Sequence, residues 1–277
     1  MKKIILIAAS LLLCVSVRAQ VLKLYKGSDL VATYSADEVD KAVFEQEEPS
    51  TDTKEYVDLG LPSGTLWATC NIGASSPEEY GDYFAWGETS GYNDGKTDFS
   101  WSTYKWMTSG QSSWQYVTKY TFADGQTSGC WYDSDGNYVG TTVNGVTYTD
   151  KTELDLEDDA AYVNWGAGWR MPSHAQQQEL VNSSYTSTEW TTMNGVYGRK
   201  ITSLTNGNSI FLPAAGYRYN GSLNDAGSGG YYWSRSLCSY YSGDAWLLDF
   251  LSGVVFTGNG NGRYYGQSVR PVRAVAE

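Results

Sequence analysis

The chain is poor in the side chains that build metal and nucleophilic sites. Its only histidine is His174, and of its four cysteines, three lie beyond residue 19: Cys70, Cys130 and Cys238. No CxxC pair and no neighbouring cysteine and histidine occur, so the spacing of a zinc site is lacking. One disulfide with one remaining thiol is possible, and the sequence does not select the pair. We expect no metal, no cofactor and no catalysis that needs two histidines.

Basic residues are also scarce. The chain has 19 Lys and Arg against 31 Asp and Glu, which gives a formal net charge of −12 at pH 7. Binding to a phosphate backbone depends on clustered Lys and Arg side chains. We therefore expect no nucleic-acid partner.

Long apolar runs are absent beyond the N-terminus. Residues 1–19 begin with two lysines, continue in an apolar run and end on Ala19. This is the pattern of a Sec-type signal peptide cleaved after Ala19, and its apolar part is too short to span a membrane. Cys14 follows three leucines instead of a small residue, which disfavours a lipid-attached form. The mature chain is expected to have no transmembrane span and to be periplasmic, held at the cell surface or secreted.

A small unit is predicted at residues 20–50. Apolar and polar residues alternate on both sides of the polar residues 26–29, which predicts a β-hairpin. The S-x-x-E spacing of Ser35 and Glu38 is that of a capping box and predicts a short helix through Val43. Residues 45–51 are polar and unpatterned, which predicts a linker.

Residues 51–277 are predicted to form one β-rich domain of the α+β class. Three Asn-Gly pairs separate apolar or β-branched runs, and each predicts a type I′ hairpin turn, at 144–145, 194–195 and 206–207. Two stretches are expected to be helical: 155–162, which opens with acidic residues, and 172–182, which opens with Pro172. We therefore predict short strands and hairpins, about two helices and long ordered loops.

The C-terminal segment has a composition of its own. Residues 228–276 contain no Lys, Glu or Met and are rich in Tyr, Ser, Gly, Asn and Asp. This mixture is typical of antibody paratopes, and it also occurs in ordinary Gly-rich β-turns. Period-2 alternation over residues 245–251 predicts a strand with two faces. The face predicted to be core holds Trp246, Leu248 and Phe250, and the face predicted to be exposed holds Leu247, Asp249 and Leu251.

Four blocks of the sequence resemble a known family. They are YVDLGLPSGTLWAT at 56–69 with GDYFAWGE at 81–88, DDAAYVNW at 158–165 with WRMPS at 169–173, FLPAAGYR at 211–218, and GQSVRPVR at 266–273. In this order they resemble the Fibrobacter succinogenes major paralogous domain, a group of exported bacterial proteins. The resemblance implies a C-type-lectin-like fold, close in architecture to the formylglycine-generating enzymes.

That relation raises an enzymatic alternative. The residues at 160–165 and 170–173 echo those enzymes in their scaffold only, whereas the enzymes work through a cysteine pair in their C-terminal region. Here that region holds Cys238 alone. We therefore expect that the protein is not an enzyme.

The C-terminal block also resembles the variable proteins of diversity-generating retroelements, which display varied residues on a lectin-like fold. Mutation of adenines in their Asn codons does not produce Lys, Glu, Met, Gln or Trp. Between residues 234 and 267, only Trp246 and Gln267 fall outside the reachable set. The alternative is that relatives without diversification share this tail. The resemblance implies ligand-binding residues at Tyr240, Tyr241, Asp244, Leu247, Asp249, Leu251, Val254, Phe256, Asn259, Asn261, Tyr264 and Tyr265.

Two acidic stretches have an alternative interpretation as calcium sites. Residues 133–137 lack the spacing and the distal Glu of an EF-hand, and a hairpin turn is favoured there. The acidic residues of 153–159 are more simply the solvated start of a helix. His174 is expected to be a surface or structural residue.

Three functional hypotheses follow. The first is an exported adhesion or recognition protein that binds an external protein or glycan. The second is a structural module of the cell surface, in which the same aromatic residues are buried between subunits. The third and least favoured is a relative of the formylglycine-generating enzymes. Exposure of Leu247, Leu251 and Phe256 in the isolated monomer, together with a monomeric mass in solution, would favour the first over the second.

Overall fold

The computed structural model describes residues 21–26, 29–35, 54–120, 142–143, 146–147, 151–239 and 241–273. Contacts divide the chain into two units, Met1–Asp52 and Thr53–Glu277. In the first unit, β1 (Val21–Lys26) and β2 (Asp29–Ser35) pair antiparallel, which confirms the predicted hairpin. The helix and linker predicted after this hairpin lie outside the described residues.

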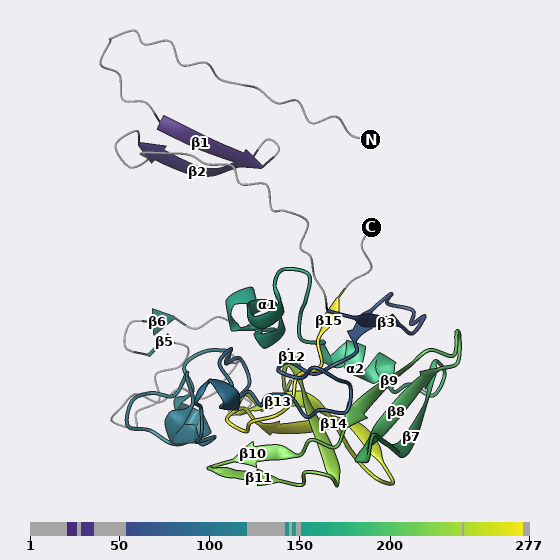
Figure 1. Cartoon of the computed structure of the whole chain (residues 1–277). Helices are drawn as coiled ribbons and strands as arrows, with labels where there is room; N and C mark the ends of the chain where they lie inside the picture. Colours follow the sequence, from purple (N-terminus) through teal and green to yellow (C-terminus); the bar gives the residue numbers. More distant parts are fainter. Residues whose placement is uncertain are drawn as a thin grey trace, which may run out of the picture. The chain divides into compact units, whose positions relative to one another are not determined.

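The second unit is β-rich, with two short α-helices among its described residues, as predicted for an α+β chain (Figure 1). The helices are α1 (Ala160–Trp165) and α2 (His174–Leu180), and single 3-10 turns occur at η1 (Tyr92–Asp94), η2 (Trp101–Thr103), η3 (Trp114–Tyr116) and η4 (Leu156–Asp158). The strands are β3 (Tyr56–Asp58), β4 (Leu66–Ala68), β5 (Thr142–Val143), β6 (Val146–Thr147), β7 (Thr186–Met193), β8 (Val196–Ser203), β9 (Ser209–Pro213), β10 (Tyr217–Tyr219), β11 (Ser222–Asn224), β12 (Gly229–Leu237), β13 (Asp244–Leu251), β14 (Val255–Gly262) and β15 (Val272–Arg273).

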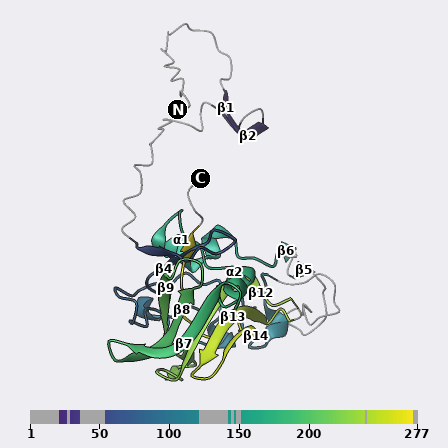
Figure 2. The ribbon, with the colours of Figure 1, turned by 90° about the vertical axis from the view of Figure 1, so that its right-hand side faces the viewer.

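Three sheets of three strands organise this unit. The first and last strands of the unit meet in a sheet of order β15-β4-β3, and the other two sheets are the meanders β7-β8-β9 and β12-β13-β14. Figure 2 shows the two meanders side by side, with α2 next to them. The hairpin β10-β11 is joined to the C-terminal sheet by a bridge between Gly216 and Gly230.

The Asn-Gly pairs have two outcomes where the structure describes them. Asn194 and Gly195 both have positive φ angles, 49° and 84°, and join β7 to β8 in the predicted two-residue turn. The prediction at 206–207 is wrong, because β8 ends at Ser203 and β9 begins only at Ser209. There the Ser203 hydroxyl accepts hydrogen bonds from the backbone of residues 205 and 206 and holds a wider loop. The strands flanking 144–145 pair as predicted.

Both predicted helices are present, but they are shorter than expected. The stretch 155–162 divides into η4 and α1 because Asp159 leaves helical geometry to cap α1, accepting hydrogen bonds from the backbone nitrogens of Ala161 and Tyr162. Helix α2 starts after Pro172 with a capping box between Ser173 and Gln176.

The sheet β12-β13-β14 separates two buried clusters. One cluster combines Trp233 and Leu247 with residues of α1 and with Trp86 and Trp169. The other combines Leu248 and Phe250 with residues of α2, β8 and β9. Strand β13 therefore contributes to both clusters, since consecutive side chains of a strand point to opposite faces.

Buried arginines hold the long loops in place. The Arg263 side chain is 0% exposed and donates to the carbonyl oxygens of Lys119, Tyr120 and Ser242 at 2.8–3.1 Å. Loop carbonyls inside a protein need such donors because a buried unpaired polar group is destabilising.

Candidate functional site

One face of the C-terminal sheet passes from the core to the surface along β13. On this face Ala245 and Leu247 are 0% and 2% exposed, whereas Asp249 is half-buried and Leu251 is 44% exposed. Directly opposite Asp249 lie Tyr231 of β12 and Phe256 of β14. The exposed end of this face is therefore built by three adjacent strands.

The prediction that Leu247 is exposed is wrong. Alternation correctly separates Leu247 from Leu248, but it does not reveal that protein covers both faces of β13. A central strand buried on both sides loses the contrast between an apolar and a polar face. Leu248 and Phe250 are core residues as predicted, at 1% exposure each.

Trp246, which is predicted to be a core residue, is more exposed than expected. It is half-buried and stacks on the ring of His174 at 4.3 Å between ring centroids. The Nε2 atom of His174 lies 2.5 Å from the carbonyl oxygen of Thr257. His174 is thus a structural residue. It lines, together with Trp246, an open pocket of about 430 Å³ that Glu153 and Gln178 also border.

A β-bulge in β14 gives Asp249 one polar partner, Asn259, and one apolar partner, Phe256. Leu247 pairs with Asn259 and Asp249 pairs with Phe256, so β14 has one extra residue between these positions. The amide of Asn259 donates to both carboxylate oxygens of Asp249, at 3.1 and 3.2 Å. The ring of Phe256 is 46% exposed beside this pair.

Tyrosines from three segments form one continuous group next to Asp249. Tyr264 and Tyr265 stack at 4.6 Å, and Tyr219 stacks on Tyr265 at 5.1 Å. Tyr217 meets Tyr265 and Tyr231 edge-on, at 5.5 and 5.0 Å. We call Tyr217, Tyr219, Tyr231, Tyr264 and Tyr265 the tyrosine cluster. All five rings are at least partly exposed, and Tyr219 is 40% exposed.

Two residues outside the cluster contact its members. The Tyr231 hydroxyl donates to Asp225 Oδ2 at 2.9 Å, and Trp101 lies 4.6 Å from the ring of Tyr264. Burial raises the pKa of Tyr231, as do its hydrogen bond to Asp225 and the nearby charges. Burial also raises the pKa of Tyr264. These phenols therefore remain neutral at physiological pH and offer ring faces and hydroxyl donors.

The tyrosine cluster and the exposed end of the sheet are contiguous, and we call them together the recognition surface. It consists of Tyr217, Tyr219, Asp225, Tyr231, Asp249, Leu251, Phe256, Asn259, Tyr264 and Tyr265. Sequence reasoning missed four of these: Tyr217, Tyr219, Asp225 and Tyr231. The alternating tyrosines of Tyr217-Arg218-Tyr219 are the only local signal that could have indicated two of them.

None of the other described residues expected in the site belongs to the tyrosine cluster or pairs with Asp249. Tyr241 packs on Trp114 at 5.1 Å, and Asn261 accepts a hydrogen bond from the next backbone nitrogen. Val254 is 40% exposed at the turn between β13 and β14. Burial raises the pKa of the Asp244 carboxyl to about 6. Tyr240 lies outside the described residues.

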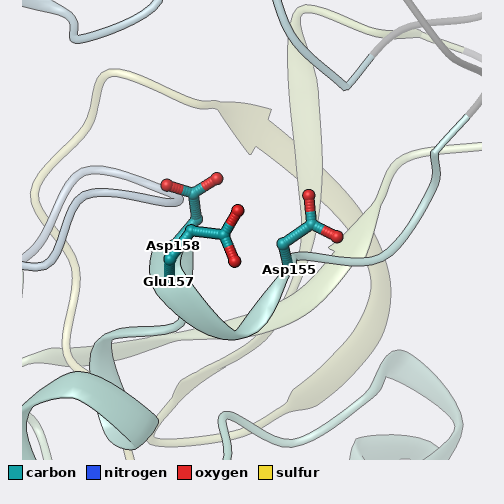
Figure 3. Close-up of side chains that lie close together, drawn as sticks. All are labelled: Asp155, Glu157 and Asp158. Atoms are coloured by element: carbon teal, nitrogen blue, oxygen red, sulfur yellow. The ribbon is translucent and has the colours of Figure 1, made fainter. Parts of the chain in front are cut away.

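The acidic segment at 153–159 is more buried than predicted. Asp158 is 2% exposed and Asp159 is 0% exposed, so they do not form a solvated helix start. Oxygen atoms of Asp155, Glu157 and Asp158 lie within 4.8 Å of one another (Figure 3).

Lysine side chains already occupy the space beside these carboxylates. Lys105 and Lys119 both form ion pairs with Asp158, and Lys151 pairs with Asp155 at 2.7 Å. Burial alone would raise the pKa of Asp158, but hydrogen bonds from Lys119, Tyr120 and Lys105 outweigh it and lower the pKa. A bound cation would have to displace these ammonium groups, so the arrangement favours an ion-pair network over a calcium site.

The calcium or hairpin alternatives at 133–137 lie outside the described residues, as does Cys130. Cys238 is 0% exposed, and so it is not presented to a substrate.

No family model, curated protein or solved structure matches the chain. In the part of the chain that the structure describes, no helix has the length and apolar character needed to cross a membrane.

Proposed function

We propose that this protein is exported and binds an external protein or glycan through the recognition surface, on a C-type-lectin-like scaffold. The observation that carries the proposal is the tyrosine cluster, whose rings contact one another yet remain accessible. Rigid, partly exposed aromatic groups beside adaptable Asn and Asp side chains are the composition of a paratope. Aromatic residues, tyrosine among them, also dominate the binding energy at many protein interfaces.

The scaffold assignment rests on the four sequence blocks. The block at 56–69 supplies β3 and β4, and the block at 266–273 supplies β15, which pairs with β4. The first and the last of the resembling blocks therefore pack together in one unit, as a shared scaffold requires.

Retroelement diversification is part of the same proposal. The recognition surface includes Asp249, Leu251, Phe256, Asn259, Tyr264 and Tyr265 from the candidate variable set. Of the two non-reachable residues, Gln267 is 0% exposed and Trp246 is half-buried. An adenine-rich near-copy of the 3′ end of the gene, beside a reverse transcriptase gene, would establish diversification. A gene without either would refute it.

The binding proposal is tested by labelling the purified protein and measuring its attachment to glycan arrays, peptide arrays and whole cells. We expect Tyr219→Ala and Phe256→Ala to abolish attachment without lowering the melting temperature. The matched control is Tyr197→Ala on β8, because Tyr197 is 51% exposed and also stacks on an aromatic ring, that of Trp190. Equal loss in the control would contradict the proposed location. Sedimentation showing a dimer that Tyr219→Ala dissociates would favour an assembly module instead.

A further inference from the structure

The recognition surface carries two carboxylates that form no ion pair with the described residues of the chain. Asp225 accepts a hydrogen bond from the Tyr231 hydroxyl, and Asp249 lies directly opposite Tyr231 in the sheet. Among the ion pairs formed by the described residues, none includes Asp225 or Asp249. Both negative charges are therefore uncompensated within this part of the protein.

Two arginines beside recognition-surface residues direct their charges elsewhere. Arg218 lies between two cluster residues in sequence, but its guanidinium sits 3.2 Å from the ring centroid of Tyr92 and 5.0 Å from that of Tyr83. Arg199 is buried and donates to the carbonyl oxygens of residues 251, 252 and 254. Neither guanidinium forms an ion pair with the surface carboxylates.

Tyrosine rings add to the negative character of this surface. The face of an aromatic ring carries the negative part of its quadrupole and attracts cations, an effect that strengthens when water is excluded. The Asp249 carboxyl is half-buried, and this burial raises its pKa. A partner that covered Asp249 without supplying a positive charge would leave a buried unpaired carboxylate, which is strongly unfavourable.

We propose that the recognition surface binds a protein segment that presents an arginine or lysine side chain to Asp225, Asp249 and the tyrosine cluster. This inference rests on the proposed function and names the class of its ligand. Arginine fits better than lysine, because a planar guanidinium can stack on a ring while it donates to a carboxylate. A neutral glycan supplies no charge to balance Asp249, and a second copy of this acidic chain would add negative charge.

The test is selection of peptides from a random display library by the immobilised full-length protein. We expect the selected peptides to be enriched in Arg, then in Lys, and to be depleted of Asp and Glu. Their affinity should fall about tenfold or more in Asp225→Asn/Asp249→Asn, a range measured for close charge pairs across interfaces. Raising the salt concentration should lower the association rate of the parent protein more than that of this variant.

The substitutions are chosen to preserve the fold. Asp225 has a positive φ of 56°, a conformation that Asn also tolerates. Asn at position 249 removes a poorly solvated charge, so the melting temperature should not fall. Tyr197→Ala again serves as the control surface.

Three results would overturn the inference. One is selection of peptides without basic enrichment, and another is failure to select any peptide that depends on the recognition surface. The third is full binding by the double Asn variant while Tyr219→Ala abolishes it, which would keep the proposed surface and reject its cationic ligand. If both variants bound selected peptides as well as the parent does, the proposed function itself would fail.

Discussion

Truncation of Leu247 to alanine should destabilise the second unit as strongly as truncation of Leu248, although the two side chains point to opposite faces of β13. Leu247 is 2% exposed and Leu248 is 1% exposed, in separate buried clusters. Removing a buried leucine side chain costs about 3–5 kcal/mol, because the lost burial adds to the cavity left behind. For a unit of this size, that corresponds to a fall in melting temperature of roughly 6–20 °C.

The controls lie on the same face of the same sheet. Leu251 and Phe256 are 44% and 46% exposed, so their alanine variants should stay within about 0.5 kcal/mol of the parent. Thermal melting and urea denaturation of the four variants provide the assay. If Leu247→Ala resembled Leu251→Ala, the face would be solvated along its whole length, and the division of β13 between core and surface would be refuted.

Three further outcomes are expected. Adding calcium or a chelator should leave the melting temperature nearly unchanged, because Lys105 and Lys119 already pair with Asp158; a rise of several degrees in calcium would show preferential binding to the folded state. Asp244→Asn should stabilise the protein above pH 6 and leave it unchanged near pH 4. Burial raises the pKa of Asp244 from 3.8 to about 6, so ionisation penalises the fold increasingly between these values; equal stability of variant and parent at pH 8 would contradict this. Incubation with a cysteine-containing peptide should yield no formylglycine, since Cys238 is buried; product that disappears in Cys238→Ser would disprove this.

Local features of the fold could be predicted from the sequence. The turn at Asn194 and Gly195 follows from their tolerance of positive φ, and the start of α2 follows from Ser173 and Gln176. These signals depend on residues close together in the chain. The loop at 206–207 was mispredicted because its shape depends partly on Asp58, whose carbonyl oxygen accepts from Asn206 and Asn208.

The site could be predicted only in part, for the same physical reason. Tyr264, Tyr265 and Asp249 were found because the composition of their own segment is unusual. Tyr217 lies before that segment, and only the packing of β10 against β12 brings it to the site. Tyr231 lies within the segment but before the first candidate binding residue, Tyr240. Leu247 was misassigned because α1 and the loops around Trp86 cover its face, which no pattern within β13 encodes.

The anchoring of Tyr120 and Lys151 has a consequence for protein engineering. The Tyr120 hydroxyl accepts a hydrogen bond from the backbone nitrogen of Asp155, and Lys151 donates to the Asp155 carboxylate. Arg263 donates to the carbonyl oxygen of Tyr120. Asp155 thus ties together two parts of the chain that lie far apart in sequence. When the second unit is redesigned, Asp155 is therefore a position to leave unchanged.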